Sequence, residues 1–97
     1  MTKALDDVLA ERKRQKTVEG WTEEHDDKLT DCSMAMAASC YAEHATRPIY
    51  DMYKHQLSPY RWPWLNRWWK PKNPRRDLVR ACALILAEIE RLDRLQK

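Results

Sequence analysis

The stretch NPRRDLVRACALILAEIERLDRL at positions 73–95 carries the strongest structural signal in this sequence. Asn73 followed by Pro74 is typical of a helix start, because asparagine caps the first turn and proline is tolerated at the first helical position. Apolar residues then recur at alternating intervals of four and three, which indicates one continuous seam along a helix. The seam comprises Leu78, Cys82, Ile85, Ile89 and Leu92. Val79 and Leu86 widen it, so the stretch predicts a long amphipathic helix in a helical bundle.

The whole chain predicts an all-α fold: a small bundle of about four helices in one domain, residues 1–97. Its single glycine disfavours a β fold rich in hairpins, which needs glycine at tight turns. Further helices are predicted at about Lys3–Val18, Asp31–Ala45 and Pro48–Leu57. A Trp- and Pro-rich irregular segment is predicted over 58–73, and no apolar run approaches the roughly 20 residues of a membrane span.

Short polar side chains mark the predicted starts of the earlier elements. Thr2 would cap the first helix, Thr22 a single turn within 19–27, and Thr30 or Asp31 the helix that follows. The alanine-rich face of that last helix predicts a central position, because small side chains let neighbouring helices approach closely. The first helix is predicted to leave its cations solvated, namely Arg12, Lys13, Arg14 and Lys16.

Charge and cysteine content suggest where the protein works. Residues 1–31 carry six Lys/Arg and nine Asp/Glu, whereas residues 32–97 carry twelve and six, which predicts ion pairs within one chain or between two. Cys32, Cys40 and Cys82 form an odd set, so we expect reduced, buried thiols and a cytoplasmic localisation. A small core also predicts a homodimer through the helices at 31–45 and from 73 onward.

The acidic turn at 19–27 is the first candidate for chemistry. Glu23, Glu24, Asp26 and Asp27 crowd their charges, which Mg²⁺ or the cations of the basic tail would relieve. His25 in the middle of the turn would act as an acid or base, or would cap the turn.

The second candidate is the segment RWPWLNRWWKPK at positions 61–72, which leads into two further arginines. Tryptophans interleaved with cations are typical of base-stacking surfaces and of protein interfaces, and they also suit a lid packed on the helices. A binding surface would comprise Trp21, His25, Trp62, Trp64, Arg67, Trp68, Trp69, Lys70, Arg75 and Arg76. The tryptophans would be apolar anchors and the cations would meet anionic groups.

These motifs together resemble a family of small phage and prophage proteins. The resemblance rests on ERxRQ from position 11, EGWTxEHDD from 19, WPW from 62, WWKP from 68, RRDLV from 75 and AEIERLDR from 87. It implies a mobile-element origin and a cytoplasmic setting, and it brings no established activity. Relatives tend to have His and Gly-Glu-Leu where this chain has Leu29 and residues 32–34 (CSM), which removes a candidate metal-binding glutamate.

A weaker resemblance is to the all-α nucleoside triphosphate pyrophosphohydrolases of the MazG type. That family binds Mg²⁺ through ExxE and ExxD pairs, and Glu90-x-x-Asp93 has the second spacing. The resemblance implies a metal set of Glu24, Asp26, Asp27, Glu90 and Asp93. Lys70, Arg75 or Arg76 would then bind phosphate, and Trp21 or a later tryptophan would stack on the base.

Two functions of different classes follow. The first is a non-catalytic accessory protein of a phage or mobile element, with no cofactor, that binds a host protein or small anionic ligand through the Trp-rich segment and the acidic turn. The second is a Mg²⁺-dependent nucleotide pyrophosphohydrolase. Nucleic-acid binding is a further alternative that the modest net charge of +3 disfavours. No motif identifies a catalytic nucleophile.

Overall fold

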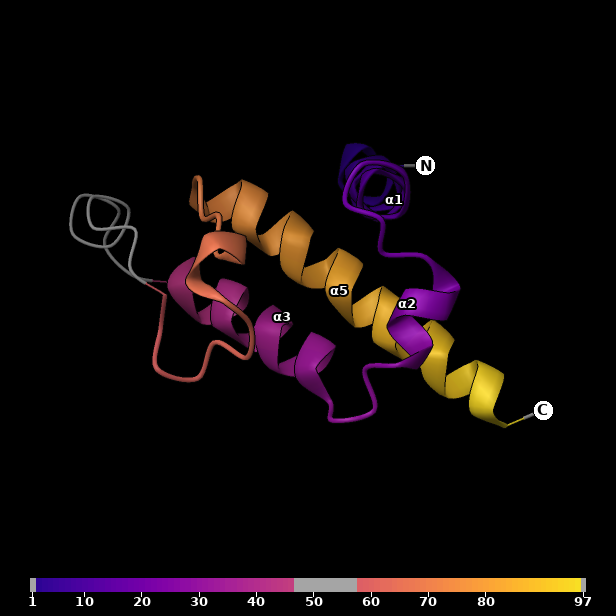
Figure 1. Ribbon diagram of the computed structural model, residues 1–97. Coiled ribbons are helices and arrows are strands. Elements are labelled where there is room, and N and C mark those ends of the chain that lie inside the picture. The colour runs from indigo at the N-terminus through magenta and orange to yellow at the C-terminus, as the bar shows by residue number, and fades with distance from the viewer. Residues whose placement is uncertain (1, 47–57, 97) are drawn as a thin grey trace.

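The computed structural model describes residues 2–46 and 58–96, which form an all-α fold (Figure 1). Its elements are α1 (Lys3–Thr17), α2 (Glu23–Asp27), α3 (Ser33–His44), the 3₁₀ turn η1 (Asn66–Trp68) and α5 (Pro74–Leu95). The helix predicted at Pro48–Leu57 lies outside the described residues. Within the described ranges, no helix is long and apolar enough to cross a membrane.

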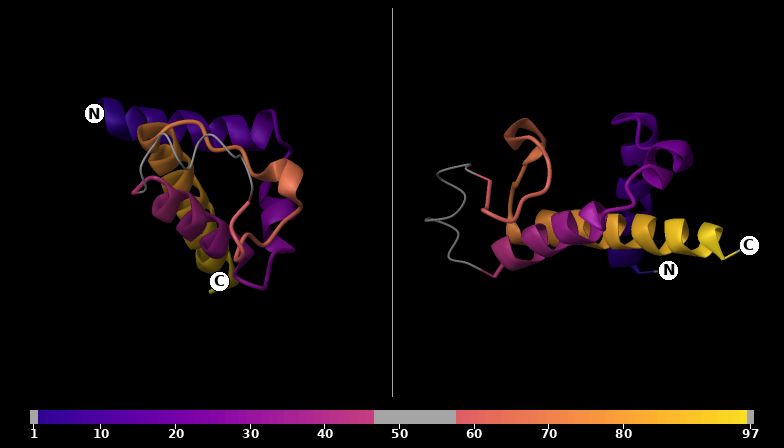
Figure 2. Two further views of the ribbon diagram at one scale, coloured as in Figure 1. Left: turned by 90° about the vertical axis from the view of Figure 1, so that its left-hand side faces the viewer. Right: turned by 60° about the horizontal axis from the view of Figure 1, so that its bottom comes forward.

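Helix α5 is the central element, and the three other α-helices of the described ranges, α1, α2 and α3, all pack on it. Helix α3 runs antiparallel alongside it, whereas α1 crosses its other side steeply and appears end-on in Figure 1. Helix α2 lies against the C-terminal half of α5 (Figure 1). The views in Figure 2 show segment 58–73 folding back from α3 towards α2. This return places the Trp-rich segment beside the acidic turn.

Three of the predicted helix caps are confirmed. The Thr2 hydroxyl accepts a hydrogen bond from the Leu5 amide, and the Thr22 hydroxyl accepts one from the His25 amide. The Asn73 side chain accepts a hydrogen bond from the Arg76 amide at 2.8 Å, and Pro74 occupies the first turn of α5.

The predicted cap of the alanine-rich helix is wrong. Helix α3 begins at Ser33 rather than Asp31, because Cys32 adopts a left-handed backbone conformation with φ of 64°. The Asp31 carboxylate instead accepts a hydrogen bond from the Ser33 amide at 3.1 Å. Asp31 therefore closes a turn before the helix.

Removing the Asn73 cap is expected to destabilise the protein measurably. Asn73→Ala should lower the free energy of unfolding by about 1 kcal/mol, because it leaves an amide at the start of α5 without its acceptor. Urea denaturation would measure the change. Asn73→Asp keeps an acceptor oxygen and should stay close to wild type. Equal stabilities of the Ala and Asp variants would contradict a capping role.

The inward face of α5 is not the predicted one. The buried residues of α5 are Asp77, Val79, Ala81, Ala83, Leu84, Ala87, Glu88 and Arg91, so of the predicted seam and its two flanking residues only Val79 is buried. Five of them form an inner stripe that has the same four-three spacing as the apolar seam but lies one residue earlier, namely Asp77, Ala81, Leu84, Glu88 and Arg91. Leu78, Ile85, Ile89 and Leu92 are between 44% and 50% exposed, and Cys82 is exposed too. Cys32 is also exposed, so the expectation of buried cysteines holds only for Cys40.

The physical reason lies in the size of the side chains on the two stripes. Ala37 and Ala38 of α3 belong to the same buried core as Ala81 and Ala87 of α5, and the two helices pack on each other, so small residues contribute to their contact. Larger residues of the same core, Met34, Tyr41, Trp62, Trp69 and Leu84, fill the space around this contact. The bulky aliphatic stripe next to it is left facing outward.

Charged ends of the inner stripe are paired rather than solvated. Asp77 accepts hydrogen bonds from the Lys72 amide at 2.9 Å and from His44, whose Nδ1 lies 3.2 Å from its carboxylate. Glu88 and Arg91 bond to each other at 2.7 Å. A buried polar group is tolerated when its hydrogen bonds are made, so these pairs allow a partly charged stripe to face inward.

Candidate functional site

The Trp-rich segment is shaped by short-range hydrogen bonds of its own backbone. The Trp62 amide donates to the Pro59 carbonyl at 3.0 Å, and the Trp62 indole donates to the Leu65 carbonyl at 3.1 Å. The amides of Trp68 and Trp69 donate to the carbonyls of Leu65 and Asn66 in the 3₁₀ turn. These turns send the four tryptophans of the segment in two different directions.

Trp62 and Trp69 face inward, which corrects their assignment as accessible anchors. They are 8% and 4% exposed, and their ring centroids lie 4.9 Å apart. Trp69 stacks on Tyr41 at 4.7 Å, and the Tyr41 hydroxyl accepts a hydrogen bond from the Lys70 amide. These two tryptophans therefore attach the segment to α3, as the lid interpretation predicts.

Trp64 and Trp68 face the acidic turn, where they meet Trp21. The Trp21 ring centroid lies 5.6 Å from that of Trp64 and 6.4 Å from that of Trp68. Gly20, with φ of +79°, turns the chain after α1, and the Trp21 amide donates to the Gln15 carbonyl at 2.9 Å. Glycine is suited to this position because a side chain would be strained there.

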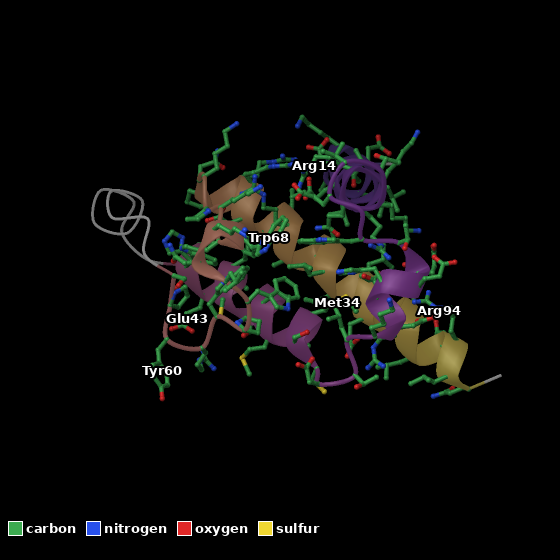
Figure 3. The ribbon with its side chains drawn as sticks, viewed as in Figure 1. Arg14, Met34, Glu43, Tyr60, Trp68 and Arg94 are labelled. Atoms are coloured by element: carbon green, nitrogen blue, oxygen red, sulfur yellow. The ribbon has the colours of Figure 1, made fainter. Side chains whose placement is uncertain are left out.

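These outer tryptophans form a pocket of about 560 Å³, which we call the Trp groove. Its lining residues are Trp21, His25, Leu29, Pro63, Trp64, Leu65 and Trp68. His25 stacks nearly parallel to Trp21, and its Nδ1 lies 3.3 Å from the Asp26 carboxylate. Trp68, labelled in Figure 3, comes from the irregular segment and lines the groove. Two segments far apart in sequence therefore share one surface.

Two of the four predicted anion-binding cations lie beside the Trp groove. Arg67 and Lys70 each place their charge 5.5 Å from the centre of the Trp68 ring, a cation–π geometry. Arg75 and Arg76 are instead paired with Asp7 and Glu11 of α1. The structure does not bring those two arginines to the groove.

The carboxylates of the predicted metal set are mostly engaged by arginines. Asp26 is buried and lies 2.7 Å from Arg12, which also contacts Glu90 at 3.3 Å. Asp27 pairs with Arg94 at 2.7 Å, near the Arg94 label in Figure 3. Glu24 and Asp93 are exposed at the surface. Over residues 2–46 and 58–96, no group of three or more His, Cys, Asp or Glu side chains could hold a metal ion.

Arg12 corrects the expectation that the cations of the first helix are solvated, because its side chain is buried. Its partners come from α2 and α5, so it joins three elements. The other pairs between the acidic start and the basic tail follow the same pattern, since Arg75, Arg76 and Arg94 all bond to residues of the first 31. Ion pairing within one chain is therefore confirmed.

A second, small polar pocket was not predicted from the sequence. It has a volume of about 20 Å³ beneath Trp21 and Trp68, and Glu11, Gln15 and Arg80 contribute to its wall. Gln15 Oε1 and Arg80 Nη1 are buried there without a hydrogen-bond partner, and this volume is enough for a bridging water. The four-residue spacing of Glu11 and Gln15, which places both side chains on one face of α1, is the sequence signal that could have indicated this pocket.

Burial alone would raise the pKa of Glu11, but Arg14, Arg76 and Arg80 outweigh it and hold that pKa below its ordinary value. The ionised Glu11 therefore stabilises the fold at neutral pH, and this contribution is lost as the pH falls through the folded-state pKa. Burial raises the pKa of Tyr41, which also lines this pocket.

The Trp groove has apolar walls, and Arg67 places a cation at one edge, whereas the Lys70 ammonium lies 3.7 Å from the Glu19 carboxylate. The chemistry of the groove therefore suits the capture of an apolar side chain next to an acidic one. His25 is the one titratable side chain among its lining residues, and it is held by a carboxylate that is itself bound to Arg12. No protein-family model, curated protein or solved structure matches this chain.

Proposed function

We propose that this protein is a non-catalytic binding protein whose Trp groove accepts an apolar side chain of a partner protein. The observation that carries the proposal is the division of the tryptophans into a buried pair and an outer set that lines one open groove. Its volume of about 560 Å³ lies within the range of roughly 300–1,000 Å³ found for ligand pockets. Tryptophan and arginine are also enriched among the residues that dominate binding energy at interfaces.

A partner protein fits the groove better than a small anionic ligand does. Small-molecule pockets combine apolar walls with several convergent polar groups. Here the polar groups of the lining are a histidine and the indole N–H groups, while the charges of Arg67 and Lys70 lie over Trp68 at the edge. We therefore expect a partner segment with a large apolar residue followed by acidic residues.

The biological setting of the proposal is that of a phage or mobile-element accessory protein acting on a host protein in the cytoplasm. It is supported by the sequence resemblance to small phage and prophage proteins. It is also supported by the cysteines, all three of which are free thiols. The alternative of a Mg²⁺-dependent pyrophosphohydrolase would require Mg²⁺ to displace Arg12 and Arg94 from their carboxylates.

Selection from a random displayed-peptide library on the immobilised full chain would test the groove. We expect enriched peptides that pair an aromatic or large aliphatic residue with acidic neighbours. Trp64→Ala should weaken the selected peptides by about 30-fold, the effect of losing a 2 kcal/mol interface anchor. Fluorescence anisotropy of a labelled peptide would measure the affinity.

Two further variants make the result decisive. Leu65→Ala removes an exposed side chain of the groove wall and should also weaken binding, while its circular dichroism spectrum stays that of wild type. Tyr60→Ala removes a fully exposed aromatic side chain outside the groove and should leave binding unchanged. Peptides that bind the Trp64 and Leu65 variants as well as wild type, or a selection with no enriched motif, would overturn the proposal.

A further inference from the structure

The outward stripe of α5 is a second apolar surface of this protein, besides the Trp groove. We call it the α5 seam, and it comprises Leu78, Cys82, Ile85, Ile89 and Leu92. Close to half of each of its four aliphatic side chains is exposed. Contiguous apolar stripes of this kind mark interaction sites on soluble proteins, whereas single exposed aliphatic residues do not.

The spacing of the α5 seam points to a helix as its partner. Alternating steps of four and three residues give a mean period of 3.5, which is the repeat of helices that pack along each other in a coiled coil. From Leu78 to Leu92 the seam extends over about 21 Å, at 1.5 Å per residue. Two such seams can bury each other along four turns of helix.

We propose that the α5 seam packs antiparallel against the α5 seam of a second copy of this chain. The charges at the edge of the seam support this orientation. Arg75, Leu86 and Asp93 lie on one edge by helical periodicity, with opposite charges at the two ends. Antiparallel pairing brings Arg75 close to Asp93 of the partner subunit, whereas parallel pairing would set like charges side by side.

The seam is also self-complementary in this orientation. With the two-fold axis between Cys82 and Ile85, Cys82 faces Ile85 of the partner subunit, and Leu78 faces Ile89 of the partner subunit. Leu92 then lies against the aliphatic stem of Arg75 of the partner subunit. The guanidinium of Arg75 is bonded to Asp7 within its own chain but is more than half exposed, so it would also reach Asp93 of the partner subunit. A two-fold interface requires each contact to occur twice, and this register meets that condition along the whole seam.

The dimer goes beyond the proposed function, because it uses a different surface. None of the five residues of the α5 seam lines the Trp groove. A dimer would therefore carry two grooves, and failure of the groove to bind peptides would leave the dimer unaffected.

Sedimentation equilibrium of the full chain would test the proposal. We expect wild type at micromolar concentration to have twice the chain mass of 11.7 kDa. Ile85→Glu should raise the dimer dissociation constant by at least about 100-fold, because it places a charge in the centre of the interface. Its circular dichroism spectrum should stay helical, since Ile85 is already half exposed within one chain. Val18→Glu changes an exposed apolar residue outside the seam and should remain dimeric.

Charge reversal would test the orientation. Arg75→Glu and Asp93→Arg should each weaken the dimer several-fold, and the double variant should recover most of the loss only if the helices are antiparallel. A monomeric wild type at 100 times the micromolar range, a dimeric Ile85→Glu variant, or no recovery in the double variant would each overturn the proposal.

Discussion

Trp69→Ala is expected to lower the free energy of unfolding by about 3–5 kcal/mol, the cost of deleting a large buried aromatic side chain. Trp69 stacks on Tyr41, packs edge-on against Trp62 and lies 5.3 Å from His44. These contacts attach the irregular segment to α3. Domains of this size have a total stability of roughly 5–15 kcal/mol, so the loss is a large share of it. Urea denaturation followed by circular dichroism would measure it.

The matched control for Trp69→Ala is a substitution of an aromatic residue in the same segment whose side chain is fully exposed. Tyr60→Ala should change the free energy of unfolding by less than about 0.5 kcal/mol, because Tyr60 is fully exposed (Figure 3). A Trp69→Ala variant as stable as Tyr60→Ala would contradict the placement of Trp69 in the core. Loss of a buried tryptophan should lower the free energy of unfolding, whereas loss of a tryptophan that lines the Trp groove should mainly weaken peptide binding.

Arg12→Met should also cost about 3–5 kcal/mol, because it leaves the buried Asp26 carboxylate without its cation. Arg12 and Asp26 are 4% and 1% exposed, and the distance between the guanidinium and the carboxylate is 2.7 Å. Arg12 also donates to the Trp21 carbonyl and to Glu90. Its loss would loosen α2 and the wall of the Trp groove together. Guanidinium chloride denaturation would measure the change in stability.

Two comparisons would show whether the buried charge is the cause. Lys13→Met removes an exposed cation of the same helix and should be nearly neutral. The double variant Arg12→Met, Asp26→Leu should recover much of the lost stability, because an apolar pair need not be solvated or bonded. A double variant less stable than Arg12→Met alone would show that Asp26 contributes mainly through other contacts, such as the one to His25.

The local structure of this protein follows closely from short-range patterns. Thr2, Thr22 and Asn73 cap helices as predicted, because a cap depends on one side chain and an amide three residues later. The prediction failed at Asp31, where the left-handed conformation of Cys32 moves the helix start. The residue types around Cys32 do not predict this left-handed conformation, because it depends on the path of the chain into α3.

The candidate site was predictable in its composition and not in its geometry. Charge and residue type predict that the acidic turn and the Trp-rich segment form one surface, and the structure brings Trp21 to Trp64 and Trp68. The sequence of the Trp-rich segment does not predict which of its four tryptophans face inward. That choice depends on the turns at Trp62 and Trp68 and on the position of Tyr41.

Residue patterns alone predict that this chain is helical, where most of the described helices begin, and that α5 has an apolar stripe. These properties depend on hydrogen bonds and periodicity within one segment. Which stripe of α5 faces α3 depends on tertiary packing, because the two possible arrangements of the helices bury different sets of side chains. The stripe with Ala81 and Leu84 allows close contact with the alanines of α3, and its charged members find partners in Lys72, His44 and each other. The aliphatic stripe beside it stays about half exposed.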